Sequence, residues 1–402
     1  MATGIFSTAS IALTTDLQKK SFAALITRLM PNGSAPLFGM TSMLKTETAV
    51  APEHGFFTKT MLFPSVTTSA SYVSTDTTIA VTSTANIVPG MILRVEATGE
   101  NIIVNTVPSS TSIVVARGVG NVAAGNIGSG VILMQIGSAY EEGSLRPNAV
   151  NLTAVRVTNL TQIFRNSWAV TDTARATMTI AGDTNVAESK QDCVGFHAAD
   201  IEKALFFGQQ SSGTRNGQPF RTMDGLISIV GNAAYYPPAF PTPNVFTAGS
   251  TTNWTQLEGF LDVVFNQATD PKVASERVLF VGGTARKVIN NIGRLNGTYQ
   301  LVDGMTNYGL QFSTLKSTRG TFRIIEHPLF NASATWAKMA VAVDLTSFNL
   351  AYLADRKTKS EEDFDDNGID AVGGSLTTEL TCIVKNPPAN SIIYNLTAAA
   401  AG

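Results

Sequence analysis

Charged residues are scarce in this chain of 402 residues. Asp, Glu, Lys and Arg make up 14% of it, against about 25% in a typical globular protein. Apolar residues still make up 44%, so the chain can bury hydrophobic cores and is not intrinsically disordered. The 28 basic residues are balanced by 30 acidic ones. This balance excludes a strongly basic protein that coats nucleic acid, because such binding needs an excess of Lys and Arg.

Long apolar runs and paired cysteines are also missing from the sequence. No stretch reaches the roughly 18 consecutive apolar residues that a transmembrane helix needs. The N-terminal segment has no basic residues before its weakly apolar stretch, so it predicts no signal peptide. Cys193 and Cys382 lie far apart and indicate no disulfide framework. A reducing compartment is therefore the default expectation.

The first half of the chain changes character several times. Residues 16–30 repeat apolar side chains at helical spacing and predict a helix, preceded by a flexible arm of small polar residues. Residues 31–65 are interrupted by prolines and predict an extended, loop-like segment. Residues 66–138 contain short β-branched runs separated by turn residues, and they predict a separate all-β module. Two long strands are then predicted at 156–166 and 167–180, forming a hairpin or ribbon.

Residues 185–207 predict the clearest helix in the chain. At 1.5 Å per residue such a helix is roughly 34 Å long, enough to act as a spine for other elements. Gly195 lies in its middle and lowers its stability by about 1 kcal/mol relative to Ala, so we expect a close packing contact there. Gly208 is expected to end the helix. The predicted buried stripe consists of Val186, Cys193, Val194, His197, Ile201, Ala204 and Leu205.

The second half of the chain mixes helices and strands. Helices are predicted at 254–268 and 284–293, and residues 356–374 are expected to form a charged loop. Together with the first half, this pattern predicts an α+β protein. The predicted strands are 277–281, 321–326, 339–344, 348–353 and 376–384.

Motifs for nucleotide or calcium binding are incomplete. Gly282 and Gly283 follow a predicted strand and precede a helix, but the glycine pattern of a dinucleotide site or P-loop is missing, so they indicate a tight turn. Residues 363–368 (DFDDNG), with Asp363, Asp365 and Asn367 at alternate positions, match the start of a calcium loop. However, Gly374 stands where a bidentate Glu is needed. An acidic turn is the favoured interpretation, and a weak cation site at this loop stays open.

Other candidate sites are equally incomplete. Cys193 and His197 share one helix face, but a zinc site needs three or four ligands, so a buried structural pair is favoured over a reactive one. The densest basic cluster, at 356–359, is followed at once by Glu361 and Glu362 and is interpreted as a solvated loop. We therefore predict no catalytic, cofactor-binding or metal-binding residues, no cofactor and no enzyme activity.

The order of the predicted elements resembles the major capsid proteins of tailed bacteriophages. These proteins have the Hong Kong 97-like (HK97-like) fold, and the likeness is to a subgroup with an inserted β domain. It spans most of residues 15–395 and is most specific around the predicted spine helix. The residues that carry it are 159–164 (NLTQIF), 170–173 (VTDT), 181–182, 199–205 (ADIEKAL), 323–328 (RIIEHP), 343–344, 373–374, 379–381 and 386–387.

The resemblance implies a division of the chain into capsid domains. The implied parts are an N-terminal arm at 1–55, an E-loop ribbon at 56–65 and 139–180, an inserted β-barrel or Ig-like domain at 66–138 on the outer surface of the shell, a peripheral domain at 181–220 and 371–402 that contains the spine helix 185–207, and an axial domain at 221–370.

The resemblance also implies a function and partners. The chain would self-assemble as hexamers and pentamers into the icosahedral head shell, and enclose double-stranded DNA without sequence-specific binding. Because the arm begins almost at Met1, the resemblance implies a separate scaffolding protein. It also implies a portal and no membrane partner, and whether a decoration protein binds stays an open question. The expected location is the virion, after assembly in the host cytoplasm. Lys59 is the only lysine of the ribbon, and nothing in the sequence indicates a crosslink there.

Three other interpretations stay open at this point. An encapsulin-type compartment shell would use the same fold for a different cargo. A β-rich surface binding or adhesion protein would suit residues 66–138, and an α/β enzyme would place its site at the Gly282 and Gly283 turn.

Overall fold

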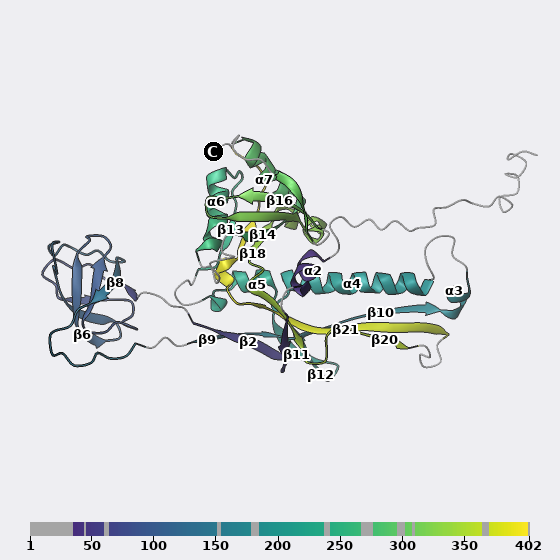
Figure 1. The fold of residues 1–402 in the computed structure, drawn as a ribbon, viewed down its shortest axis with the longest axis horizontal. Helices are drawn as coiled ribbons and strands as arrows, with labels where there is room; N and C mark the ends of the chain where they lie inside the picture. The colour runs from purple at the N-terminus through teal and green to yellow at the C-terminus, as the bar shows by residue number, and fades with distance from the viewer. Residues whose placement is uncertain are drawn as a thin grey trace, which may run out of the picture. The chain divides into compact units, whose positions relative to one another are not determined.

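The structure is a computed structural model, and its described residues fall into two compact units: one formed mainly by 57–156, the other by the rest of the chain (Figure 1). The helix predicted at 16–30 lies outside the described residues. None of the described helices is both long and apolar enough to cross a membrane. The described residues are 35–43, 46–59, 64–150, 154–177, 185–236, 242–266, 276–295, 302–307, 310–363 and 370–400.

The unit at 57–156 contains one antiparallel sheet with the strand order β3-β8-β5-β6-β7-β4. Alternate residues of each strand point into its core, as Ile113 and Val115 do in β7. The short strands predicted between 66 and 138 correspond to β4 to β8. The strands are β3 (Ser65–Thr67), β4 (Thr78–Ala80), β5 (Met91–Val95), β6 (Asn101–Ser109), β7 (Ser112–Ala116) and β8 (Ile132–Ser138).

A buried ion pair holds the loops of this unit together. The Glu100 carboxylate accepts hydrogen bonds from Arg117 Nε and Nη2 (both 2.8 Å) and from the backbone N–H groups of Gly118 (2.9 Å) and Gly125 (3.2 Å). Arg117 also donates to carbonyl groups at both ends of the 73–76 turn. Burial opposes ionisation of Glu100, but these hydrogen bonds outweigh it and lower its pKa.

The second unit contains a long ribbon sheet. Its longest strand, β21, pairs with β10 along one edge and with β20 and then β19 along the other, and β1 pairs with β19 in parallel. The five strands are β1 (Glu47–Ala49), β10 (Gln162–Thr171), β19 (Phe348–Leu353), β20 (Lys359–Asp363) and β21 (Ala371–Val384).

The hairpin expected from strands 156–166 and 167–180 is wrong. Instead, β9 (Val155–Leu160) pairs with β2 (Glu53–Thr58), and β10 pairs with β21. The break between β9 and β10 lies at Thr161. The chain continues through Asn166 and Ser167 as one strand, because both residues pair with β21.

The predicted helix at 185–207 is α4 (Asn185–Phe207), and it runs along β10 and β21 (Figure 1). Two details of the prediction are wrong. Val194 is 55% exposed and does not belong to the buried stripe. A Cβ atom added to Gly195 would meet no atom within 4 Å, so this glycine has no close packing contact. Gly208 does follow the last helical residue, and a Cβ there would lie 2.6 Å from the Ala204 carbonyl oxygen.

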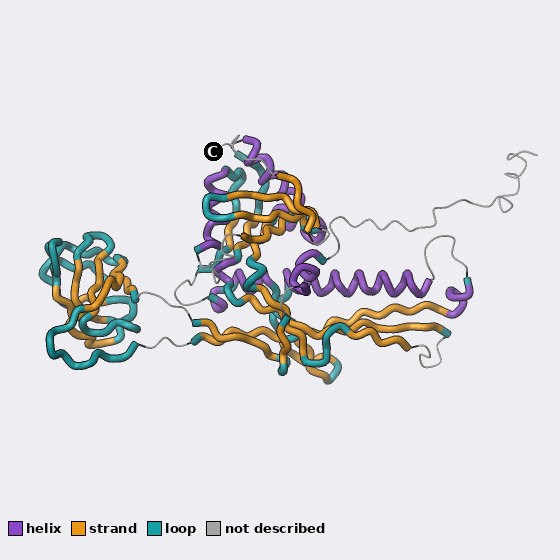
Figure 2. The backbone as a smooth tube through the Cα atoms, in the orientation of Figure 1, coloured by secondary structure: helices purple, strands orange, loops and turns teal. Residues whose placement is uncertain are grey.

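A mixed sheet with the order β13-β22-β18-β14-β17-β16-β15 forms the rest of this unit. Its central strands are apolar on both faces: Phe280 of β14 packs with Phe206 at the end of α4, whereas Leu279 packs with α6 (Trp254–Asp262) and α7 (Gly283–Leu295). Figure 2 shows strands of this sheet beside helices of the same unit. The strands are β13 (Val245–Thr247), β14 (Glu276–Val281), β15 (Val302–Asn307), β16 (Leu310–Lys316), β17 (Thr321–Glu326), β18 (Ala340–Val343) and β22 (Ser391–Tyr394).

The remaining elements are short or flank the sheets. They are the helices α2 (Pro36–Met43), α3 (Asp172–Ala176), α5 (Leu226–Gly231), α6 (Trp254–Asp262) and α7 (Gly283–Leu295), the hairpin of β11 (Ser211–Arg215) and β12 (Gln218–Thr222), and the 3-10 helices η1 (Ala233–Tyr235), η2 (Val263–Phe265), η3 (Pro328–Ala332), η4 (Trp336–Lys338) and η5 (Pro387–Ala389).

Two segments expected to be loops are regular structure. α2 begins at Pro36, and proline is compatible with the first turn of a helix, where its missing N–H group is not needed. β20 lies within the expected charged loop 356–374 and pairs with β21 over Lys359 to Asp363. Backbone pairing to an existing strand stabilises β20, although its own sequence has no apolar alternation.

Candidate assembly elements

The segment around α2 is anchored to the spine helix by a buried carboxylate. Glu202 of α4 is 1% exposed. Its Oε1 accepts a hydrogen bond from the Leu37 N–H group (2.8 Å), and its Oε2 accepts one from the Phe38 N–H group (2.7 Å). These donors belong to the first turn of α2, where the N–H groups lack partners within the helix. Glu202 therefore caps a helix that lies 165 residues away in the sequence.

His327 completes this anchor from the other side. Its Nε2 donates to Glu202 Oε1 (2.6 Å), and its Nδ1 accepts from the Leu329 N–H group (3.1 Å). The second bond fixes the tautomer that carries its proton on Nε2. The ring is fully buried and stacks on Phe330, with a centroid distance of 4.9 Å, while Phe206 meets it edge-on. The anchor thus joins α2, the end of α4 and the turn after β17.

Glu47 provides a second attachment for the N-terminal segment. Its Oε1 accepts hydrogen bonds from Asn349 Nδ2 (2.8 Å) and from Lys385 Nζ, and His54 lies beside its other oxygen. Burial opposes its ionisation, but the bonds from Lys385 and Asn349 outweigh this and lower the pKa of Glu47. With the parallel pairing of β1 to β19, this contact fixes residues 47–49 on the ribbon sheet.

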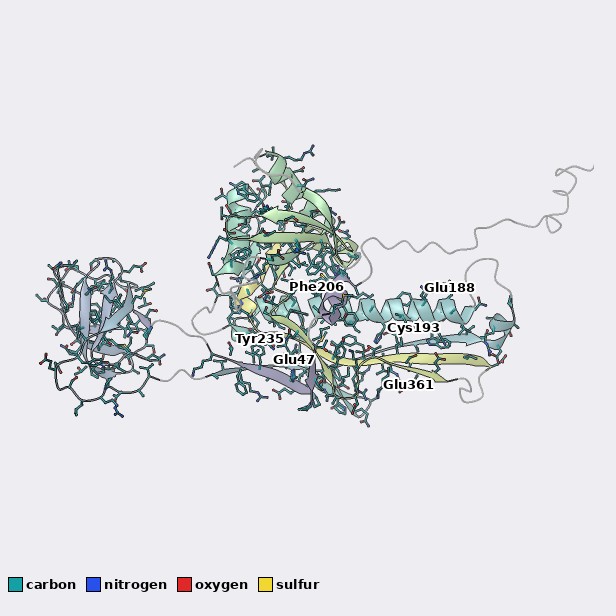
Figure 3. All side chains as sticks on the ribbon, in the orientation of Figure 1. Glu47, Glu188, Cys193, Phe206, Tyr235 and Glu361 are labelled. Carbon is teal, nitrogen blue, oxygen red and sulfur yellow. The ribbon has the colours of Figure 1, made fainter. Side chains whose placement is uncertain are left out.

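Cys193 and His197, which share one face of α4, are both buried against the ribbon. Burial raises the pKa of the Cys193 thiol, which packs against Trp168 of β10. The two ring nitrogens of His197 are hydrogen-bonded to Asn166 Oδ1 and Thr378 Oγ1, both at 2.7 Å. Burial lowers the pKa of His197, so the neutral ring joins α4 to both β10 and β21. Figure 3 shows Cys193 on the spine helix beside the ribbon.

The Gly282 and Gly283 turn does not form a phosphate cradle. A Cβ atom on Gly282 would lie 2.5 Å from Ala337, which explains why a glycine stands here. The Gly283 N–H group, at the start of α7, already donates to Asn331 Oδ1 (2.6 Å). The turn is therefore a close strand-to-helix connection, capped by a side chain of the same unit.

The basic cluster at 356–359 is not a simple solvated loop. Arg356 Nε pairs with the buried carboxylate of Glu379 (2.6 Å), and Lys357 lies over the ring of Tyr352. The acidic segment 364–369, which carries most of the calcium-like motif, lies outside the described residues. Within the described residues there is no group of three or more His, Cys, Asp and Glu side chains that could hold a metal ion.

This geometry is that of a structural subunit: an anchored N-terminal segment, a ribbon joined to a spine helix, and a two-sided sheet. Comparisons with known proteins agree. A family model described as SU10 major capsid protein matches residues 6–397. The chain belongs to this family.

One relative is the major capsid protein of Pseudomonas phage PaMx41. It is 38% identical over 398 residues, which cover 95% of this chain and 93% of that protein. The predictions of a phage major capsid protein and of a protein that is not an enzyme are thereby confirmed. The described helices and strands confirm the α+β class. The family match also decides against the enzyme, adhesion and encapsulin interpretations.

Two solved structures that resemble this chain have low sequence identity to it. One from Mycobacterium phage Adephagia is 11% identical, with a TM-score of 0.48 and 98% of each chain covered. The SrpI encapsulin of Synechococcus elongatus PCC 7942 is 8% identical, with a TM-score of 0.43, 62% of this chain and 80% of that chain covered.

Proposed function

We propose that this chain assembles as hexamers and pentamers into the icosahedral head shell of a tailed phage, around its double-stranded DNA. The observation that carries the proposal is the family match over residues 6–397, which includes both units of the fold. A shell is one chain repeated around local symmetry axes, so extended elements that reach neighbouring copies suit it.

The domain roles are part of the same proposal. Residues 1–55 are the N-terminal arm, and the anchors at Glu202 and Glu47 support a fixed base for it. Residues 56–65 and 139–180 are the E-loop ribbon, with the β domain 66–138 inserted on the outer surface. Residues 181–220 and 371–402 are the peripheral domain, and 221–370 the axial domain. The sheets cross these boundaries: β22 pairs with β18, and β19 and β20 pair with β21.

The proposed partners follow from this role. They are other copies of the chain, a separate scaffolding protein, a portal and a decoration protein, with assembly in the host cytoplasm before the shell becomes part of the virion. The enclosed DNA is contacted without sequence readout. The formal net charge of −2 supports this, because few cations are available to hold phosphates tightly.

The test is expression of the full chain together with its genomic neighbours, followed by sedimentation and negative-stain electron microscopy. Closed particles of uniform size, or rings of six copies, are the expected result. Nuclease treatment before extraction then identifies the cargo: protected DNA in mature particles supports a phage head, whereas a packaged protein with no DNA would move the assignment to a compartment shell. A chain that stays monomeric with every neighbour present contradicts the proposal.

A further inference from the structure

Two cationic residues, Arg165 and Lys359, lie on the face of the ribbon sheet that points away from α4. Because His197 contacts Asn166 and Thr378, alternate residues of β10 and β21 face the helix, and those between them face away. Arg165 of β10 lies opposite Thr377 of β21, which lies opposite Lys359 of β20. These three residues therefore share the outer face. With strands about 4.8 Å apart, the two cationic residues are separated by about 10 Å at the backbone.

The two cations lie at a hollow in which neither forms an ion pair with another described residue. The hollow measures about 270 Å³ and is lined by Arg165, Arg356, Lys359, Glu361 and Thr377. Arg356 is already paired with the carboxylate of Glu379. The side chains of Arg165 and Lys359 are exposed and make no hydrogen bond or ion pair with another described residue. The hollow therefore has room and charge for a further carboxylate, the same group that Arg356 binds nearby.

The opposite end of the same strands carries carboxylates. Asp172 directly follows β10, and Asp370 directly precedes β21. Arg175 Nη1 donates to Asp172 Oδ1 (2.7 Å). The Asp172 backbone N–H group donates to the Asp370 carbonyl group (3.3 Å), so the two residues lie side by side. Arg175 lowers the pKa of Asp172, whereas the neighbouring Asp172 raises the pKa of Asp370. At this tip Arg175 forms an ion pair with Asp172, and Asp370 has no ion pair with another described residue.

The cations and the carboxylates cannot meet within one copy. Seven residues of extended strand separate Arg165 from Asp172, a distance of roughly 24 Å. A contact between them must join two copies of the chain.

We propose that the hollow at Arg165 and Lys359 receives the Asp172 and Asp370 tip of a second copy. This inference rests on the proposed function, since it needs a shell in which copies repeat. In this contact one end of a copy meets a different surface of the next copy. Such a head-to-tail contact forms a closed ring when the rotation from each copy to the next adds up to a full turn, and the ring of copies in a capsomer needs a contact of this kind. The net negative charge of the chain disfavours DNA phosphate as the occupant, because tight phosphate binding needs an excess of cations.

Charge reversal in the full chain tests the pairing. Arg165→Glu with Lys359→Glu places like charges at the contact, and we expect the yield of closed particles to fall at least about tenfold. Asp172→Lys with Asp370→Lys should do the same. Combining all four substitutions restores opposite charges between copies, and the yield should return to near the wild-type level. Lys203→Glu is the matched control, because this exposed cation lies on α4 outside the hollow and should leave assembly unchanged.

The outcomes separate this inference from the proposed function. If the wild-type chain forms particles and the first double variant does so equally well, the hollow is not an interface. Loss of assembly without rescue in the fourfold variant overturns the pairing with Asp172 and Asp370. Normal particles that contain less DNA would assign the hollow to phosphate instead. If even the wild type fails to assemble, the proposed function fails and this inference fails with it. Unfolding midpoints close to that of wild type confirm that each variant is folded.

Discussion

Replacing Glu202 by Gln should loosen the N-terminal segment from the spine helix. Three N–H groups converge on the Glu202 carboxylate: those of Leu37, Phe38 and His327. A glutamine has one side-chain oxygen, so at least one buried donor loses its acceptor, which costs about 1–3 kcal/mol. The bonds that remain lose their charge assistance, about 1 kcal/mol, and the α2 dipole loses a favourable charge worth about 0.3–1 kcal/mol.

The total expected loss is about 3 kcal/mol in the free energy of unfolding, a large part of the roughly 5–15 kcal/mol that stabilises a typical protein. Urea unfolding followed by near-ultraviolet circular dichroism measures it. At about 2–4 °C per kcal/mol, the melting temperature should fall by roughly 6–12 °C. Trypsin should also cleave faster at Lys45, which follows α2 in the sequence.

Lys203→Gln is the matched control for this experiment. Lys203 is the next residue on α4, but its side chain is 56% exposed and pairs only with the exposed Asp200 among the described residues. Its replacement should change stability by less than about 0.5 kcal/mol. If Glu202→Gln is as mild as this control and leaves the cleavage rate unchanged, the carboxylate does not anchor α2 and the reasoning is refuted.

Further predictions concern the glycines of the spine helix and the ion pair of the β unit. Gly195→Ala should stabilise the protein by about 1 kcal/mol, because alanine favours the helix and its methyl group would meet nothing within 4 Å. Gly208→Ala should instead destabilise the protein by about 1–3 kcal/mol, because its methyl group would lie 2.6 Å from a carbonyl oxygen. Chemical denaturation of both variants checks the opposite signs. Glu100→Gln should destabilise the β unit by about 3 kcal/mol, since it removes the charged partner of buried Arg117. The pKa of Glu100 is lowered from its ordinary 4.5, so its contribution to the free energy of unfolding is fully present above that pH and is lost as the pH falls through the folded-state pKa. Acid titration of a 57–156 fragment, followed by far-ultraviolet circular dichroism, should show this loss of stability in the wild type and not in the variant.

The spine helix could be predicted from the sequence because its signals are local. The helical spacing of Cys193, His197, Ile201 and Leu205 and the following Gly208 define α4 without any knowledge of its partners. The same spacing placed Val194 in the stripe, although it is 55% exposed. The period of a helix gives the direction of its buried face, but the width of that face depends on what packs there.

The elements that the sequence analysis missed are stabilised by distant residues. α2 has no acidic residue in its own first turn, and its cap comes from Glu202 on another helix. β20 has no apolar alternation, and it exists because β21 offers a free edge. The buried position of Glu202 also had no local signal, because its partner His327 lies 125 residues away. Such contacts become visible only when the topology is known.

The assignment as a shell subunit is tested most directly by a cryo-electron microscopy reconstruction of particles assembled from the full chain. We expect closed shells in which α4 and the β10–β21 ribbon repeat in rings of six and five copies. We also expect α2 to stay docked on Glu202 in every copy. Particles built without repeated rings, or a protein that remains monomeric or dimeric with all of its genomic neighbours present, would contradict the assignment as a shell subunit.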